Sequence, residues 1–362
     1  MKPFLPLVLC ALSFCLAEES PYATPEEFGA KPLQLQAAEH IIPSPVRQWH
    51  VDGERPLRAA LVKMQGKWGK EARITLRTTT GRSIELPVSA LSDEDLDAVR
   101  NWMQQNQFIP IRTLKHGEFS ARVLGVSYAA AVHASPNGSI TLKPGKQYMQ
   151  IRLAMQDGTV RNRICLAEPL KTEAEARNQS SAVWVLKEET RQELLRYMQT
   201  HPEPTEHAPL PIAANAAEAL ACAALQDVSI VYLTLGPRGC EADKALHRYL
   251  EAHPEAGAIW AQRHVFLISY RNSQNKLPEQ CLHDLRELHW HHGEPTTYDF
   301  SRETAYDVQQ RSTHITGMRF VQPADRPTSQ MNNPPLQFRI SPAELQTLHP
   351  ADITFGPFVL CK

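Results

Sequence analysis

Apolar and polar residues alternate along three short stretches in the first third of the chain. Each stretch is apolar mainly on one face, which is the pattern of antiparallel strands that pack one side against a core. The three predicted strands are Leu57–Gln65, Ala72–Arg77 and Ser83–Val88. Ser92 and the acidic residues after it predict a helix start, because Ser caps helices and acidic side chains favour the first turn. We therefore expect residues 46–104 to form a small antiparallel sheet with one helix.

A second β-rich unit is predicted over residues 112–200. Its strand candidates are Glu118–Val126, Ser139–Leu142, Gln147–Met155 and Thr159–Leu166. Asn137-Gly138 and Asp157-Gly158 are typical of hairpin turns. The spacing of apolar residues predicts an amphipathic helix over Glu188–Thr200. No catalytic motif stands out in this part of the sequence, so we expect a structural or interaction module.

The pattern changes after a Pro-rich linker at residues 201–214. An Ala-rich helix capped by Asn215 is followed by an apolar strand, a second helix and another apolar strand. The predicted ranges are Asn215–Gln226, Val228–Leu235, Cys240–His253 and Val265–Tyr270. Continuous apolar strands are typical of a parallel sheet covered on both faces. Residues 215–362 are therefore expected to form an α/β domain, whose Pro-rich tail adds strands near His314–Val321 and Leu336–Ile340.

The first 17 residues have the features of a secretory signal peptide. A positive start precedes an apolar run from Phe4 to Leu16, which is too short to span a bilayer. We expect cleavage after Ala17 and a secreted or periplasmic protein without a membrane span. A short membrane anchor and a lipid anchor at Cys15 are the alternatives. Residues 18–45 are rich in proline and are expected to form an extended leader.

The expected compartment determines which cysteines remain and whether they form disulfides. The chain has seven cysteines, and cleavage would leave five: Cys165, Cys222, Cys240, Cys281 and Cys361. Thiols outside the cytosol tend to form disulfides. Because five is an odd number, at least one thiol would be free or bonded to another chain. The sequence does not define the pairing.

Composition and charge exclude several functional classes. The chain has 38 basic and 39 acidic residues among 362, whereas nucleic-acid binders normally have a basic excess. A hydrophobic content of 42% argues against general disorder and against a multi-span membrane protein. The sequence holds 16 glycines against 28 prolines and contains neither G-x-G-x-x-G nor a Walker loop. We therefore expect no nucleic-acid partner and no cofactor.

Residues 46–104 resemble the SLA-one homology domain, first type, in the order and spacing of several motifs. The matching segments are Arg47-Gln48-Trp49, Asp52-Gly53, Ile74-Thr75-Leu76, Gly81-Arg82, Ile84-Glu85-Leu86-Pro87-Val88 and Leu91-Ser92-Asp93-Glu94-Asp95. The resemblance implies a small SH3-like β-barrel. Eukaryotic members of the family bind Asn-Pro-Phe peptides, which implies a protein or peptide ligand. No peptide-contacting residue can be transferred position by position.

Two tryptophans are the binding candidates in this region. Trp49 is interpreted chiefly as a core residue, with ligand contact as the alternative. Trp68 lies between Lys67 and Gly69 in a hairpin-like loop, where an exposed aromatic ring would mark a binding surface.

Cys240 is the one cysteine with a chemical rationale. It lies where a strand ends and a helix begins, a position that favours the thiolate. The order of elements over residues 215–300 resembles a thioredoxin-like domain, in which this turn carries C-x-x-C-K. Here it is Cys240-Glu241-Ala242-Asp243-Lys244, so Asp243 replaces the second cysteine. Gly293-Glu294-Pro295-Thr296 is similar to the family's cis-proline loop.

The replacement limits the chemistry that this resemblance implies. A dithiol cycle needs a second sulfur to resolve the mixed disulfide, so Cys240 could act as a monothiol or pair with Cys281. Glu241 and Asp243 also oppose a thiolate through like charge. A redox-silent scaffold is therefore the main interpretation.

A histidine cluster near the end of this region is the last candidate. It consists of His283, His289, His291 and His292, with Asp284 and Glu287 nearby. Without an H-E-x-x-H motif we expect a helix end and no metal, although a metal site is an alternative. The sequence as a whole predicts a multi-domain α+β protein that binds a protein or peptide without catalysis. A thiol-dependent redox protein that uses Cys240 is the alternative.

Overall fold

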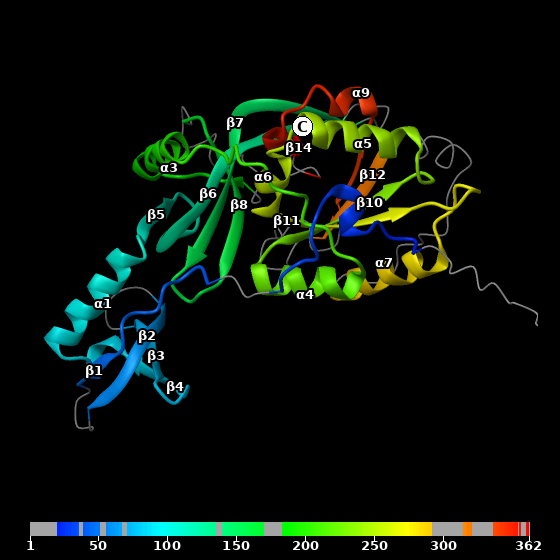
Figure 1. The fold of residues 1–362 in the computed structure, drawn as a ribbon. Coiled ribbons are helices and arrows are strands. Elements are labelled where there is room, and N and C mark those ends of the chain that lie inside the picture. Colours follow the sequence, from blue (N-terminus) through cyan, green and yellow to red (C-terminus); the bar gives the residue numbers. More distant parts are fainter. Residues whose placement is uncertain are drawn as a thin grey trace, which may run out of the picture.

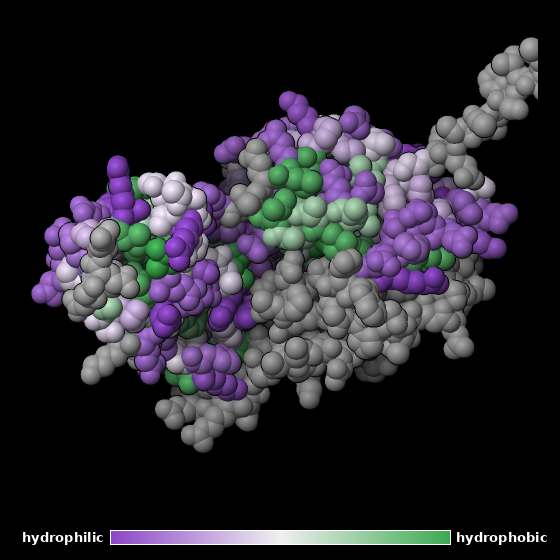
Figure 2. All heavy atoms as spheres, turned by 90° about the horizontal axis from the view of Figure 1, so that it is seen from below, coloured by the Kyte–Doolittle hydropathy of each residue, from purple (hydrophilic) through white to green (hydrophobic). Residues whose placement is uncertain are grey.

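Three separate sheets and several helices give the chain a mixed α+β architecture (Figure 1). The computed structural model describes residues 20–35, 39–50, 56–66, 71–134, 140–169, 183–291, 314–320, 336–353, 355, 360 and 361. Residues 1–17, expected to form a signal peptide, lie outside the described residues, as do Trp68 and Pro295. Within them, no helix is both long and apolar enough to cross a membrane. On the face shown in Figure 2, polar residues cover much of the coloured surface.

The first sheet is antiparallel and confirms the strands expected from alternation. Its members are β1 (Arg47–Trp49), β2 (Leu57–Gln65), β3 (Arg73–Thr78) and β4 (Ser83–Pro87), in that spatial order. A short 3-10 helix, η2 (Val88–Ala90), leads to α1 (Asp93–Gln105). The Ser92 hydroxyl accepts a hydrogen bond from the Asp95 amide, so the predicted cap is present. Val99 and Trp102 of α1 pack against the buried faces of β2 and β3.

The second sheet has six strands and receives its last strand from the end of the chain. The strands are β5 (Ile109–Thr113), β6 (Gly117–Ala134), β7 (Ile140–Met155), β8 (Val160–Leu166), β9 (Val183–Trp184) and β14 (Leu360–Cys361). Their order is β14-β6-β7-β8-β9, with β5 also paired to β6. Helix α3 (Glu188–Thr200) has the bounds that the sequence predicted and packs on β5 and β6.

One prediction in this sheet was wrong. Ser139–Leu142 and Gln147–Met155 were expected as two strands, but residues 140–142 and 147–155 belong to the single long strand β7. Ser139 lies outside the described residues. Pro144 and Gly145 separate the two ranges in the sequence. The register between β6 and β7 shifts at Ala129–Ala131, opposite these two residues. Such an irregularity accommodates a proline that has no amide hydrogen to donate.

The third sheet contains the predicted strand–helix–strand crossover. Its strands are β10 (Ser229–Leu235), β11 (His264–Tyr270), β12 (Ile315–Phe320) and β13 (Leu336–Ile340). β10 and β11 are parallel, and β12 and β13 are antiparallel additions, in the order β11-β10-β12-β13. Every residue of β10 and β11 is buried, as their continuous apolar sequences predicted.

Helices cover both faces of the third sheet. They are α4 (Ala216–Gln226), α5 (Glu241–Ala252), α6 (Ala256–Ala261), α7 (Glu279–His291) and α9 (Pro342–Leu345). The helices α5, α6 and α9 share one hydrophobic core, and α4 and α7 share the core on the opposite face. Figure 1 shows α5 above the sheet and α4 and α7 below it.

The two segments expected as leader and linker make ordered contacts with the edge strand β11. The Ala23 amide donates to the Ile268 carbonyl at 2.9 Å. Further along the same edge, the Phe266 amide donates to the Pro211 carbonyl at 2.8 Å. Both segments thereby satisfy backbone groups that an edge strand would otherwise leave unpaired. Proline content predicted extended chain here, but it could not predict this pairing.

Arg152 of β7 connects the second sheet to the third. Its guanidinium donates to the Gln226 carbonyl at 2.9 Å, to the Asp227 carbonyl at 3.2 Å and to the Gln262 carbonyl. These carbonyls lie at the C-terminal ends of α4 and α6, where a cation satisfies unpaired acceptors and interacts well with the helix dipole. The middle of the chain is thus attached to the α/β part through a charged contact.

Candidate functional site

The two motifs that carry the SLA-one resemblance meet in space. Arg47 from the R-x-W segment approaches a carboxylate oxygen of Asp95 at 3.1 Å and one of Glu94 at 2.9 Å. The Asp95 side chain is fully buried and also accepts from the His50 amide at 2.7 Å and the Ser92 hydroxyl at 2.9 Å. This arrangement ties β1 to the start of α1. Arg47 and Asp95 therefore hold the first sheet and its helix together.

Trp49 is part of the same core. Its side chain is fully buried, and its indole N–H donates to the Ala59 carbonyl at 3.0 Å. The Arg47 guanidinium lies 5.3 Å from the centre of its ring. The structure gives Trp49 a core position and leaves no side-chain surface for the ligand contact considered as an alternative. Trp68, the other candidate, lies outside the described residues.

A groove of about 350 Å³ lies on the first sheet, and we call it the sheet groove. It is bounded by the segment before β1, by outward-facing residues of β2, β3 and β4, and by the turn between β7 and β8. Its lining is Glu39, His40, Ile41, Pro43, Val62, Lys63, Thr75, Arg77, Ser83, Glu85, Asp157 and Gly158. Val62 is the extra residue of a bulge in β2, where the pairing to β3 shifts register.

The sheet groove is lined by charges of both signs and by several apolar side chains. Lys63 and Arg77 supply cations, whereas Glu85 and Asp157 supply carboxylates. Val62 provides part of the apolar surface. This mixture suits a peptide, which presents a polar backbone together with side chains of mixed character. The groove was not predicted from the sequence, because its three walls come from segments far apart in the chain.

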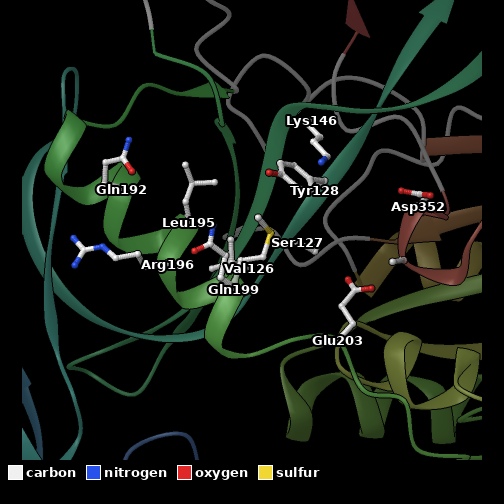
Figure 3. A pocket seen from close by; sticks show the side chains of 12 residues that line it. Val126, Ser127, Tyr128, Lys146, Gln192, Leu195, Arg196, Gln199, Glu203 and Asp352 are labelled. Carbon is white, nitrogen blue, oxygen red and sulfur yellow. The ribbon is translucent and has the colours of Figure 1, made fainter.

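A second cavity, of about 540 Å³, lies between the second sheet and residues close to the third (Figure 3). Figure 3 shows Gln192, Leu195 and Arg196 on one side and Glu203 with Asp352 on the other. Burial raises the pKa of the Glu203 carboxyl, and Arg263 at 3.6 Å acts against this shift. Glu203 is therefore already engaged by the protein's own cation.

Cys240 lies where the sequence predicted, directly before α5 and after β10. It is the N-cap residue of α5, it is partly exposed, and its side chain makes no capping hydrogen bond. Its apolar surface packs at the border of the core shared by α5, α6 and α9. Cys281 lies on α7, in the core on the opposite face of the sheet. The third sheet therefore separates the two thiols, and the alternative that Cys240 pairs with Cys281 was wrong for this structure.

Asp243, at the position of the missing second cysteine, stabilises the turn before α5. Its carboxylate accepts from the Gly239 amide at 2.7 Å and from the Tyr270 hydroxyl at 3.1 Å, and it lies 3.5 Å from the His247 ring. Burial alone would raise the pKa of this carboxyl, but the hydrogen bonds from His247 and Gly239 hold it below its usual value. The contact with Asp243 in turn raises the pKa of His247. Asp243 closes the turn before α5 and supplies no resolving group.

The other thiols whose side chains the structure describes, those of Cys165, Cys222 and Cys281, are buried. Burial raises the pKa of Cys222 to about 11 and also raises the pKa values of Cys165 and Cys281. These three and Cys240 are free thiols in the structure. Buried neutral thiols are poor nucleophiles. Among these four thiols, only that of Cys240 has the exposure that thiol chemistry requires; the side chain of Cys361 lies outside the described part of the structure.

The histidine candidates do not assemble into a metal centre within the described part of the chain. There, no three His, Cys, Asp or Glu side chains lie close enough to hold a metal ion. The side chain of His283 is largely exposed, 3.4 Å from Asp284, whose other oxygen accepts from the Tyr22 hydroxyl. His292 and the side chains of His289 and His291 lie outside the described residues.

Comparison of the chain with protein-family models, with curated proteins and with solved structures finds no match.

Proposed function

We propose that this is a secreted or periplasmic, non-catalytic binding protein whose residues 46–104 form an SH3-like SLA-one homology domain. The sheet groove is the observation that carries the proposal. It is open to solvent, lies on the region with the family motifs and combines apolar and charged surface in a form that suits a peptide. Residues 215–362 and the second sheet would then serve to present this unit.

The positions of the charged side chains in the sheet groove support a role in binding rather than a purely structural role. Arg77 and Glu85 are exposed on adjacent strands, and neither is needed to fill the core between the sheet and α1. Charged side chains at the rim of a groove select partners by complementary charge and speed association. They are therefore the residues on which ligand selection should depend.

The first experiment selects peptides from a random library on the immobilised mature chain, with an Asn-Pro-Phe peptide as a defined probe. We expect enriched peptides whose affinity falls at least about tenfold, or roughly 1.4 kcal/mol, in the Arg77→Ala/Glu85→Ala variant. Arg58→Ala, an exposed change on β2 outside the groove, is the matched control. Enrichment that survives the double substitution would place the ligand elsewhere, and no enrichment over a blank surface would reject the proposal.

The second candidate function is thiol exchange by Cys240 in a thioredoxin-like domain. It is favoured by the partly exposed thiol at the start of α5 and by the order of the third sheet, in which a parallel crossover precedes two antiparallel strands. The Cys240 thiolate would attack a disulfide, form a mixed disulfide and release one thiolate. Because Asp243 cannot resolve this intermediate, an external low-molecular-weight thiol would have to attack it and regenerate Cys240.

Insulin reduction with glutathione as the external thiol tests this candidate. A monothiol mechanism predicts turnover above the glutathione background that Cys240→Ser abolishes and Cys222→Ser retains, because Cys222 is buried. Equal background rates for the unmodified chain and for Cys240→Ser would remove the redox function.

A further inference from the structure

The start of the described chain contacts Arg238 and His247, which precede and follow Cys240 in the sequence. We call residues 20–30 the N-terminal strap; they include the 3-10 helix η1 (Pro25–Phe28). Figure 1 shows this segment, in dark blue, beside the third sheet. Tyr22 and Ala23 are almost fully buried, with 4% and 1% of their surfaces exposed. This segment is therefore packed against the rest of the protein.

The backbone of the strap is bound as an added strand. Tyr22 forms an antiparallel bridge with Ser269 of β11. The Tyr270 amide donates to the Pro21 carbonyl at 2.8 Å, and the Ala23 amide donates to the Ile268 carbonyl at 2.9 Å. Addition of an extended segment to a sheet edge is a common mode of peptide recognition, in which main-chain hydrogen bonds give affinity and side-chain pockets give specificity.

Arg238, two residues before Cys240, also binds the strap. Its guanidinium donates to the carbonyls of Ser20 and Tyr22, each at 3.1 Å, and pairs with the Glu27 carboxylate. The guanidinium also lies 4.2 Å from the centre of the Tyr270 ring. Arg238 thus binds both the backbone and one acidic side chain of the strap.

Two further side chains of the strap occupy specific places. The Tyr22 hydroxyl donates to Asp284 at 2.6 Å on the α7 side of the sheet. The Phe28 ring stacks on His247 of α5, with centroids 4.3 Å apart and an interplanar angle of 10°. The strap therefore contacts both faces of the edge of the third sheet, and its contact with α5 lies on the helix that Cys240 begins.

We propose that the edge of β11, Arg238 and His247 form a peptide-binding surface that the chain's own strap occupies in cis. The ligand is a segment whose extended part carries a tyrosine and whose following 3-10 turn carries a glutamate, five residues after the tyrosine, and then an aromatic residue. In this arrangement the strap is displaceable and limits access to the start of α5. The proposal concerns peptide binding and does not require that Cys240 be redox-active.

Hydrogen exchange in the full mature chain tests the docking of the strap. We expect the Tyr270 amide to exchange about tenfold faster or more in the Glu27→Gln/Phe28→Ala variant, because the strap leaves the edge of β11 more often. Glu26→Gln, at the exposed neighbouring position, is the matched control and should exchange like the unmodified chain. The single variant Glu27→Gln gives a milder change if the double variant is poorly folded. Unchanged exchange in both strap variants would overturn the proposal.

Adding the strap as a free peptide tests whether the surface binds this segment as a ligand. It distinguishes loss of the strap from a local electrostatic effect of the substitutions. The probe is a synthetic peptide with the sequence of residues 18–31, and the second readout is the alkylation of Cys240 by iodoacetamide, followed by mass spectrometry. In the double variant, alkylation should be faster, and the added peptide should slow both alkylation and Tyr270 exchange. A peptide carrying Glu27→Gln and Phe28→Ala should not do so. Failure of the native peptide to slow either process would show that this surface does not bind the segment as a ligand.

Discussion

Replacement of Asp95 by alanine is expected to lower the free energy of unfolding of the first sheet and α1 by about 3 kcal/mol, mainly through two lost hydrogen bonds to a charged group. The carboxylate is fully buried and compensates the Arg47 cation, and it also accepts hydrogen bonds from His50 and Ser92. Its loss leaves those donors without an acceptor. Hydrogen exchange of amides in β2 and α1, followed in urea, measures the change in this region without interference from the rest of the chain.

A control for the Asp95 variant lies on the same helix. Asp97→Ala removes another acidic residue of α1, but its side chain is 68% exposed and pairs with Arg100 on the surface. Exposed pairs contribute at most about 1 kcal/mol, so this variant should remain close to the unmodified chain. If Asp95→Ala cost no more than Asp97→Ala, Asp95 would not be the link between the R-x-W segment and the helix.

Local sequence signals predicted much of the secondary structure. The Ser92 cap, the bounds of α3 and the Asn215 cap of α4 were correct because each depends on a few adjacent residues. The crossover through α5 was also correct, since buried parallel strands are continuously apolar. Alternation and capping are short-range properties, and a single sequence contains them in full.

Long-range contacts could not be predicted in the same way. The proline-rich leader and linker gave no sign that they would pair with β11, because backbone hydrogen bonds leave no side-chain pattern. Nothing in the spacing of Cys240 and Cys281 indicated that they lie on opposite faces of one sheet. The sheet groove likewise depends on a turn at residues 157–158 meeting the segment before β1.

Acid is expected to weaken the contact between the second and third sheets, because two histidines near Arg152 resist protonation in the folded chain. Burial and the nearby Arg152 guanidinium lower the pKa of His40 to about 4. Burial also holds the pKa of His264 well below its usual value, and the cations of Arg319 and Arg263 add to this effect. Both side chains are therefore neutral in the folded protein at mildly acidic pH.

The unfolded chain binds a proton on each of these histidines below about pH 6.5, whereas folded His40 stays neutral down to about pH 4. The unfolded state therefore binds more protons in this interval, and the free energy of unfolding must fall as the pH falls. Each histidine contributes up to about 1.4 kcal/mol per pH unit. The pKa of His247 is raised, so its stabilising contribution is fully present below about pH 6.5 and it adds no slope in the more acidic interval.

Urea unfolding at several values between about pH 7 and pH 4.5 measures this slope. His40→Asn and His264→Asn should each flatten it by up to about 1.4 kcal/mol per pH unit, since asparagine cannot take up the proton. His207→Asn changes an exposed histidine in the linker and should leave the slope as it is. A double variant as acid-sensitive as the unmodified chain would mean that other groups bind the protons.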